Sequence, residues 1–281
     1  MSGLDAGIRK AAEYAASRIK GSEYRLDPDL PVASVVGISS RRSLGILRGL
    51  IRGIGLRKSL WSALCVGRGV SLRNRRMIKV GKGVTAGRGA VLDGLSRRGL
   101  VLGDNVTIGP YSIIETSGVI TDLGEGCVMG ARSAIGSHSF IGAAGGVWIG
   151  EDVIMGNRVS FHSENHVFKD TSRPIRDQGL TREGITIDDD CWVGANVTFL
   201  DGARVGRGCV IAAGSVVRGE IPPMSVIGGV PAKVMKMRER AEVYESPARG
   251  TAVGVVAGGV DGQRSGLDGL QASGPRPERT G

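Results

Sequence analysis

An aliphatic residue followed by glycine recurs every six positions through the middle of the chain. In-phase runs start at Val80, Leu102, Leu123, Ile149 and Ile187, with hexads such as VGKGVT, LGDNVT and IGEDVI. One hexad makes a short strand and a turn, and three hexads close one coil of a triangular prism with the aliphatic residues pointing inward. The pattern therefore predicts a parallel β-helix, in which residues about 18 positions apart stack on adjacent coils.

The same spacing predicts which side chains form the interior ladders. Cys191 is expected under Cys209, and Val193 under Ile211. Cysteine behaves as a small apolar residue in such a position, so these thiols are interpreted as core-filling side chains.

One long interruption divides the repeat. Phe161 ends an in-phase run, and the next in-phase residue is Ile187, which leaves 20 extra residues. The expected loop spans residues 163–186 and contains Asn165 and His166. Loops of this length inside a repeat are commonly functional.

The pattern divides the chain into four regions. A basic, amphipathic helical segment is predicted at 1–64 and the β-helix at 65–220. A cap is predicted at 221–245, with a short C-terminal helix over VPAKVMKMRERAEVY. Residues 246–281 are rich in Gly, Ser, Pro and Arg without a period, so a disordered tail is predicted there.

Helical spacing is present in two parts of the N-terminal region. Apolar residues at 4, 8, 12 and 15 predict a helix over 3–20. In SLGILRGLIRGIGLRKSLWSAL, one side of a helix carries the apolar residues and the other carries arginines. The apolar side comprises Leu47, Leu50, Ile51, Ile54 and Trp61, and the arginines are Arg41, Arg48 and Arg52. Two interpretations stay open: peripheral contact of residues 41–64 with an anionic membrane, or packing on the end of the β-helix.

Composition supports a solenoid and shows an uneven charge. Gly accounts for 47 of 281 residues and aromatic residues for only 4%, so small side chains must build the core. The net charge is +10, and residues 31–92 contain thirteen Lys or Arg but no Asp or Glu. Such a block favours an anionic partner. No nucleic-acid role is expected, because no aromatic residue for base stacking lies between Tyr24 and Trp61.

Targeting and redox signals are sparse. Residues 1–20 include charged side chains where a signal peptide has its apolar core, and no apolar run is long enough to cross a bilayer. The four cysteines show no C-x-x-C spacing. These features predict a cytoplasmic protein, peripheral on the inner face of the membrane if residues 41–64 bind lipid.

The candidate chemistry rests on one of three histidines, since histidine is the side chain best suited to proton transfer near neutral pH. His166 lies in SENHVF at the start of the long loop, His162 at a hexad corner and His138 in IGSHSF. A three-histidine zinc site resembling that of the γ-class carbonic anhydrases is disfavoured, because the spacing of the histidines does not match. No metal is predicted.

Four segments carry a family resemblance: SENHVF, RPIRDQG, ITIDDDCWVGANVTFLDGARVGRGCVIAAGSVV and IGGVPAKV. They resemble the sugar O-acetyltransferase branch of the hexapeptide-repeat acyltransferases, which includes maltose and galactoside acetyltransferases and bacterial polysaccharide O-acetyltransferases. The resemblance covers about residues 65–238 and implies that the β-helix is left-handed. It implies direct acyl transfer from acetyl-CoA, or another acyl-CoA, with His166 as the general base.

The resemblance also implies binding residues and an assembly. CoA would lie along an edge of the β-helix, with its pantetheine arm over the small side chains of Ala195 and Ala213. The CoA phosphates would contact the basic side chains of Arg218, Lys233 and Lys236. Asn165 and His138 are candidates for binding the acceptor. A homotrimer with active sites between neighbouring subunits is implied.

The favoured acceptor is a sugar hydroxyl of a saccharide or glycolipid precursor. Two alternatives are carried with it: an N-acyltransferase that acts on a nucleotide amino sugar, and a non-catalytic β-helix that binds anionic surfaces.

Overall fold

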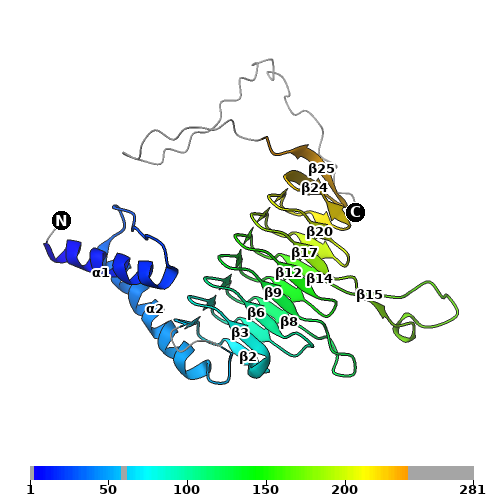
Figure 1. The fold of residues 1–281 in the computed structure, drawn as a ribbon, viewed down its shortest axis with the longest axis horizontal. Helices are drawn as coiled ribbons and strands as arrows, with labels where there is room; N and C mark the ends of the chain where they lie inside the picture. The colour runs from blue at the N-terminus through cyan, green and yellow to red at the C-terminus, as the bar shows by residue number, and fades with distance from the viewer. Residues whose placement is uncertain (1–2, 58–61, 240–281) are drawn as a thin grey trace, which may run out of the picture. The chain divides into compact units, whose positions relative to one another are not determined.

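The computed structural model describes residues 3–57 and 62–239 of the chain. From Cys65 onward the chain winds through short strands that enter three parallel sheets in rotation (Figure 1). We number these sheets 1, 2 and 3 in the order in which the chain visits them. The fold is the predicted left-handed parallel β-helix.

Each coil contributes one strand to each sheet, and sheet 1 also holds two further strands at its end, the last of which is antiparallel. Sheet 1 consists of β1 (Cys65–Val66), β4 (Thr85–Ala86), β7 (Thr107–Ile108), β10 (Ala134–Ile135), β13 (Ile154–Met155), β18 (Trp192–Val193), β21 (Val210–Ile211), β24 (Ser225–Gly229) and β25 (Ala232–Met237). Sheet 2 consists of β2 (Ser71–Arg73), β5 (Val91–Asp93), β8 (Ile113–Glu115), β11 (Phe140–Gly142), β14 (Ser160–His162), β19 (Thr198–Leu200) and β22 (Val216–Val217). Sheet 3 consists of β3 (Ile78–Val80), β6 (Leu100–Leu102), β9 (Cys127–Met129), β12 (Val147–Ile149), β17 (Ile185–Ile187), β20 (Arg204–Val205) and β23 (Glu220–Ile221).

The register confirms the stacking predicted for the last coils. Val193 pairs with Ile211, 18 positions away. Phe161 pairs with Phe199, 38 positions away, which is one 18-residue coil plus the 20-residue interruption. The first coils are longer than predicted: Cys65 pairs with Thr85, 20 positions away. The extra residues of these longer coils lie in the turns between sheets, so the strands still pair in register.

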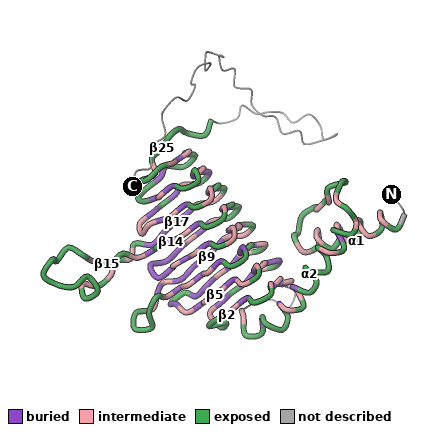
Figure 2. The backbone as a smooth tube through the Cα atoms, turned by 180° about the vertical axis from the view of Figure 1, so that it is seen from behind, coloured by how far each residue is buried: buried purple, intermediate pink, exposed green. Residues whose placement is uncertain are grey.

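The core is a set of small and aliphatic ladders, as the composition predicts. Buried residues recur along the strands of the β-helix (Figure 2). Phe161 and Phe199 are fully buried and stack with their ring centroids 4.7 Å apart. Cys191 and Cys209 are buried and free, which confirms their interpretation as core residues.

The turns between sheets stack into three corners of the prism. Many corner residues have a left-handed backbone; at the corner between sheets 1 and 2 these include Tyr111 (φ 57°), His138 (φ 56°) and Asn196 (φ 57°). Backbone hydrogen bonds join the layers, such as His138 N–H to the Pro110 carbonyl at 2.9 Å. We name the corners 1–2, 2–3 and 3–1 after the sheets they join.

Two helices precede the β-helix. The first, α1 (Gly3–Lys20), matches the predicted helix. The second, α2 (Val32–Arg52), begins before the predicted segment and ends earlier, and Gly53 follows it. The helix predicted across residues 43–64 is therefore wrong at 53–57 and 62–64, because Gly53 and Gly55 disfavour helix after Arg52. Residues 58–61, which include Trp61, lie outside the described residues.

Helix α2 packs on the free edge of the first strand. Gly45 and Gly49 are buried and face Leu64, Cys65 and Val66. A parallel ladder leaves unpaired backbone groups on its terminal strand, and natural proteins cover such edges. The glycines allow the helix backbone to approach this edge closely.

The other end of the ladder contradicts one prediction. The expected C-terminal helix is absent over Ala232–Met237, which form strand β25 antiparallel to β24. Gly228 and Gly229 precede the turn, and β25 supplies hydrogen-bond partners to β24, the last parallel strand of sheet 1. The predicted disordered tail, 246–281, and the end of the predicted cap lie outside the described residues.

Candidate functional site

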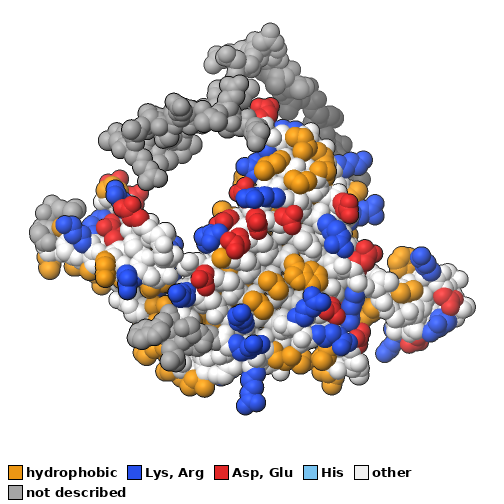
Figure 3. Space-filling view, in the orientation of Figure 1, with side chains coloured by type: hydrophobic (Ala, Val, Ile, Leu, Met, Phe, Trp, Pro, Cys, Tyr) orange, Lys and Arg blue, Asp and Glu red, His pale blue; other side chains and the backbone are white. Residues whose placement is uncertain are grey.

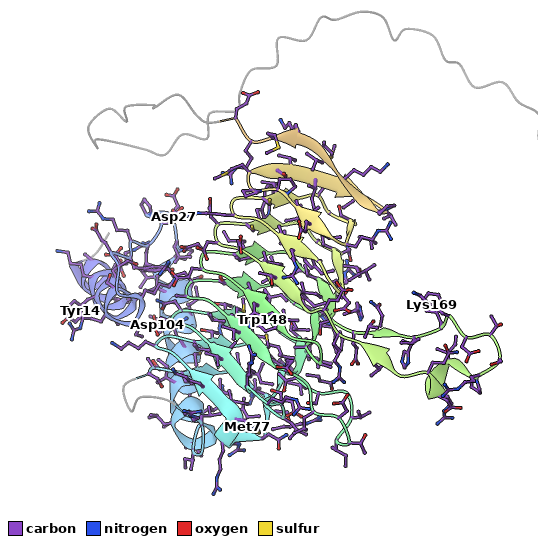
Figure 4. All side chains as sticks on the ribbon, turned by 45° about the vertical axis from the view of Figure 1, so that its right-hand side comes forward. Tyr14, Asp27, Met77, Asp104, Trp148 and Lys169 are labelled. Atoms are coloured by element: carbon purple, nitrogen blue, oxygen red, sulfur yellow. The ribbon has the colours of Figure 1, made fainter. Side chains whose placement is uncertain are left out.

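The 20-residue interruption forms an arm that leaves the 2–3 corner, to the right in Figure 1. Its two sides pair as antiparallel strands, β15 (Asn165–His166) and β16 (Leu180–Thr181). A short 3-10 turn at Ile175–Asp177 reverses the chain, and Lys169 lies on the outer part of the arm (Figure 4). His166, the predicted general base, is exposed and pairs with Leu180 close to the start of the arm.

Asp201 holds the base of the arm. Its carboxylate accepts hydrogen bonds from the Gly184 N–H at 2.8 Å and the Glu183 N–H at 3.0 Å. Asn165 Nδ2 lies 3.5 Å from the same carboxylate, so the predicted acceptor-binding amide contacts a residue of the next coil. Burial raises the pKa of the Asp201 carboxyl, while the two N–H donors oppose that rise.

An ion-pair cluster fixes the other side of the arm. The half-buried Arg182 guanidinium lies 2.8 Å from Asp122 and 3.1 Å from Glu164. Ser163 is fully buried, donates to the Gly142 carbonyl at 2.8 Å and accepts from the Gly145 N–H. Both ends of the arm are thus tied to the coils, which places His166 at a defined position beside the 2–3 corner.

Sequence reasoning missed Asp201, although a signal existed. His162 pairs with Leu200, so Asp201 stacks over Ser163, the residue at which the arm begins. A register count across the interruption therefore identifies Asp201 as the anchor. Arg182 offered no comparable signal, because its partner Asp122 lies on a separate loop.

The other two histidines lie at opposite ends of the strands of sheet 2. His162 is exposed at the end of β14, with its ring centroid 5.8 Å from Phe140. His138 lies at the 1–2 corner and stacks on Tyr111 at 5.2 Å. His162 pairs with Gly142, which is four residues beyond His138, or about 13 Å along an extended strand. The fold therefore does not bring His138 and His166 together within one chain.

The predicted cofactor-binding residues fall on two corners and one face. Ala195 and Ala213 stack at the 1–2 corner, where the Gly214 N–H donates to the Ala195 carbonyl at 2.9 Å. Lys233 pairs with Gly228 at the end of sheet 1 near this corner. Arg218 instead follows Val217 at the 2–3 corner, the corner of the arm.

Lys236 pairs with Val226, within sheet 1 and away from both groups. Both lysines are exposed, but on a strand and not on the predicted helix. Lys233 and Lys236 are three residues apart, which corresponds to about 10 Å along an extended strand. This distance is longer than the rise of one helical turn.

Two cavities lie away from these residues. One, of about 290 Å³, lies over sheet 3 and is lined by Trp148, Thr186, Asp188 and Arg207 among others (Trp148 in Figure 4). The second, of about 630 Å³, lies between α1 and α2. Neither contains a predicted site residue.

Within residues 3–57 and 62–239, no group of three or more His, Cys, Asp or Glu side chains is arranged to hold a metal ion. No helix in the same part of the chain is long and apolar enough to cross a membrane.

Comparison with known proteins agrees with the architecture. The family described as bacterial transferase hexapeptide (six repeats) matches residues 184–219. A probable acetyltransferase of Mycobacterium tuberculosis is 33% identical over 165 residues, which cover 59% of this chain and 51% of that protein. The chain thus spans about half the length of this relative.

A putative lipopolysaccharide biosynthesis O-acetyl transferase of Escherichia coli is 30% identical over 172 residues, covering 59% of this chain and 74% of that protein. An N-acyltransferase from Bacillus cereus, solved with dTDP and 3-hydroxybutyryl-CoA, matches with a TM-score of 0.46 at 15% identity, over 69% of this chain and 89% of that one. The repeat and the Escherichia coli relative define the class. The chain belongs to the family of hexapeptide-repeat acetyltransferases.

Proposed function

We propose that this protein transfers an acetyl group from acetyl-CoA to a hydroxyl group of a saccharide. The observation that carries the proposal is the placement of His166 on an anchored arm of a hexapeptide-repeat β-helix. A saccharide hydroxyl is favoured because the relative that is matched over 74% of its length is named for O-acetyl transfer in lipopolysaccharide biosynthesis.

The chemistry requires one proton acceptor and one oxyanion donor. His166 removes the proton from the acceptor hydroxyl while that oxygen attacks the thioester carbonyl carbon. A backbone N–H stabilises the oxyanion that develops. The carbon–sulfur bond then breaks, and the imidazolium returns the proton to the departing thiolate, so CoA leaves as the thiol.

The geometry supports an active site shared between two subunits. His166 lies at the 2–3 corner, whereas Ala195, Ala213 and Lys233 lie at or near the 1–2 corner. If these residues serve one reaction, the 2–3 corner of one subunit faces the 1–2 corner of its neighbour. A closed ring of three such contacts is a homotrimer with three equivalent sites.

The first test is thiol release from acetyl-CoA with free sugars, nucleotide sugars and a membrane lipid extract as separate acceptors. His166→Ala is expected to lower acceptor-dependent release by about 10²–10⁴-fold, the contribution of a general base. His162→Ala is the matched control, because His162 is an exposed histidine next to the arm but lies on the strand. Equal activity of His166→Ala and wild type would contradict the assignment, and activity with amino sugars alone would favour N-acylation.

The second test addresses the shared site. His166→Ala and Ala213→Trp are expected to be inactive separately, the latter because the indole fills the corner proposed for pantetheine. Mixed trimers from equal amounts of both variants should regain about one quarter of wild-type activity. A shared site is intact only when one subunit supplies an unaltered His166 and its neighbour supplies an unaltered Ala213. Mixed trimers without activity would place the whole site in one subunit.

A further inference from the structure

Helix α2 carries an exposed apolar face that the chain does not cover. Leu44, Leu47, Leu50 and Ile51 are each 51–63% exposed, and Ile54 just beyond the helix is 70% exposed. At 100° per residue, these helical positions span about one third of the circumference. Hydrophobic side chains line the lower left margin of the molecule in Figure 3, where Figure 1 draws α2.

The position of this face follows from the glycine contact with β1. Gly45 and Gly49 are buried against Leu64–Val66, and Leu47 lies on the opposite side of the helix. The contact that attaches α2 to the β-helix therefore directs the leucines outward. Helix α1 does not cover them either, since the groove of about 630 Å³ between the helices is lined by other α2 residues, such as Val36 and Ile46.

Arginines border the apolar face. Arg41 and Arg48 follow one another along one flank of α2 at helical spacing. Arg52 continues this row, but its Nη1 donates to the Val70 carbonyl at 2.8 Å, which holds its guanidinium against the first coil. Among the described residues, no Lys or Arg between positions 31 and 92 takes part in an ion pair; the ion pairs lie elsewhere, as at Arg97 and Arg132. This end of the molecule combines apolar side chains with uncompensated positive charge.

We propose that α2 docks the protein on an anionic membrane surface, with the leucine face inserted at the level of the lipid headgroups and with Arg41 and Arg48 at the phosphates. An amphipathic helix with a basic border is suited to this interface. A second copy that docks through the same face is a poorer occupant, because it would bring two sets of arginines together and residues 31–92 contain no acidic side chain to pair with them.

The docking does not depend on acetyl transfer, so its test uses no substrate. The full chain is floated with vesicles of phosphatidylcholine alone, and with vesicles that contain about one quarter phosphatidylglycerol. Wild type is expected to float with the anionic vesicles only. Raising the salt from about 0.1 M to about 0.5 M should release most of it, since the arginine contribution is screened.

Two double variants separate the apolar and charged contributions. Leu47→Gln/Leu50→Gln removes apolar area without adding charge and should weaken vesicle binding about tenfold or more. Arg41→Gln/Arg48→Gln should weaken vesicle binding about 25-fold, at roughly fivefold per arginine. Ile120→Gln is the matched control, because Ile120 is 83% exposed but lies on a loop far along the chain from α2; its binding should equal that of wild type.

Several results would overturn the proposal. Wild type that does not float, or that binds neutral and anionic vesicles equally, excludes an electrostatically assisted lipid interface whether or not any variant folds. Unchanged binding of the leucine variant, with loss of binding only in the arginine variant, would indicate a purely ionic contact. Light scattering that shows dissociation of the oligomer in the leucine variant, together with unchanged flotation, would assign the face to a second copy.

Discussion

The contact between α2 and β1 predicts opposite effects of the same substitution at two positions of one helix. Gly49→Ala adds a methyl group that overlaps the carbonyl oxygen of Leu64 and lies 2.8 Å from its carbonyl carbon. Gly37→Ala adds the same group at a position of α2 where nothing lies within 4 Å. Both changes improve helix propensity by about 1 kcal/mol, so only the local contact distinguishes them.

The expected size of the effect follows from the displacement. Ordinary contacts of a Cβ begin at about 3.4 Å, so α2 must move away from β1 by at least roughly 0.6 Å, and further to clear the oxygen. A gap of that order removes a quarter to a half of the dispersion energy along the contact. Overpacking of this kind costs about 1–3 kcal/mol. Because the new methyl group overlaps a backbone atom, we take the upper end of this range, about 3 kcal/mol, from which the gain of about 1 kcal/mol in helix propensity is subtracted. We therefore expect Gly49→Ala to lower the free energy of unfolding by about 2 kcal/mol, and Gly37→Ala to raise it by about 0.5–1 kcal/mol.

Two measurements check these values. Urea unfolding followed by circular dichroism gives the change in free energy, and a loss of 2 kcal/mol corresponds to a Tm lower by about 4–8 °C in a domain of this size. Hydrogen exchange of the peptide that spans α2 and β1 should accelerate about thirtyfold in Gly49→Ala if this edge opens locally. Stability of Gly49→Ala equal to or above that of wild type would refute the close approach of helix and strand.

Three further predictions concern the coils. Phe199→Ala should lower the free energy of unfolding by about 3–5 kcal/mol in urea, since it opens a cavity in a fully buried stack, whereas Phe168→Ala on the exposed arm should change it little. Burial raises the pKa of Cys127 to about 12, so Ellman's reagent at mildly alkaline pH should modify this thiol only after unfolding; rapid native reaction would contradict its burial. The hydrogen bond from Arg132 holds the pKa of Asp152 below its ordinary value, so the stabilisation is present above that ordinary value and is lost as the pH falls through the lowered one. Arg132→Met should accordingly be less stable than wild type in urea at neutral pH, and the difference should disappear in strong acid; a constant difference would contradict the linkage.

The repeat predicts more of this fold than any other sequence feature, because each coil determines which positions point into the core. Each inward position must be small or aliphatic, so the phase of the hexads identifies the core and the stacking of Val193 under Ile211. The same phase locates the interruption between Phe161 and Ile187. It does not show what those residues form, because the pairing of Asn165 with Thr181 depends on contacts outside the repeat.

The two ends of the solenoid were harder to predict, because tertiary contacts decide them. The segment AKVMKM forms a strand since the last strand of sheet 1 needs a partner, a requirement that local spacing does not reveal. Helix α2 ends at Arg52 although its apolar pattern continues, because the glycines that weaken a helix there coincide with the turn onto the first coil. Asp201 was missed for a related reason: its role appears only after the register across the arm is known.

Hexad phase also determines at which corner a side chain can act. If the hexad register is assigned wrongly by six residues, a residue is placed at the next edge of the prism. If it is assigned wrongly by a whole coil, the residue stays on the same edge and is only shifted along it. Arg218 illustrates the distinction. The resemblance groups it with Lys233 at the CoA phosphates, yet Val217 pairs with Phe199, and this places Arg218 directly above Leu200 on the corner of the arm. In a single chain Arg218 therefore lies on the same stack as His162, at the corner of the arm, and at the opposite end of the sheet 2 strands from Ala195 and Ala213.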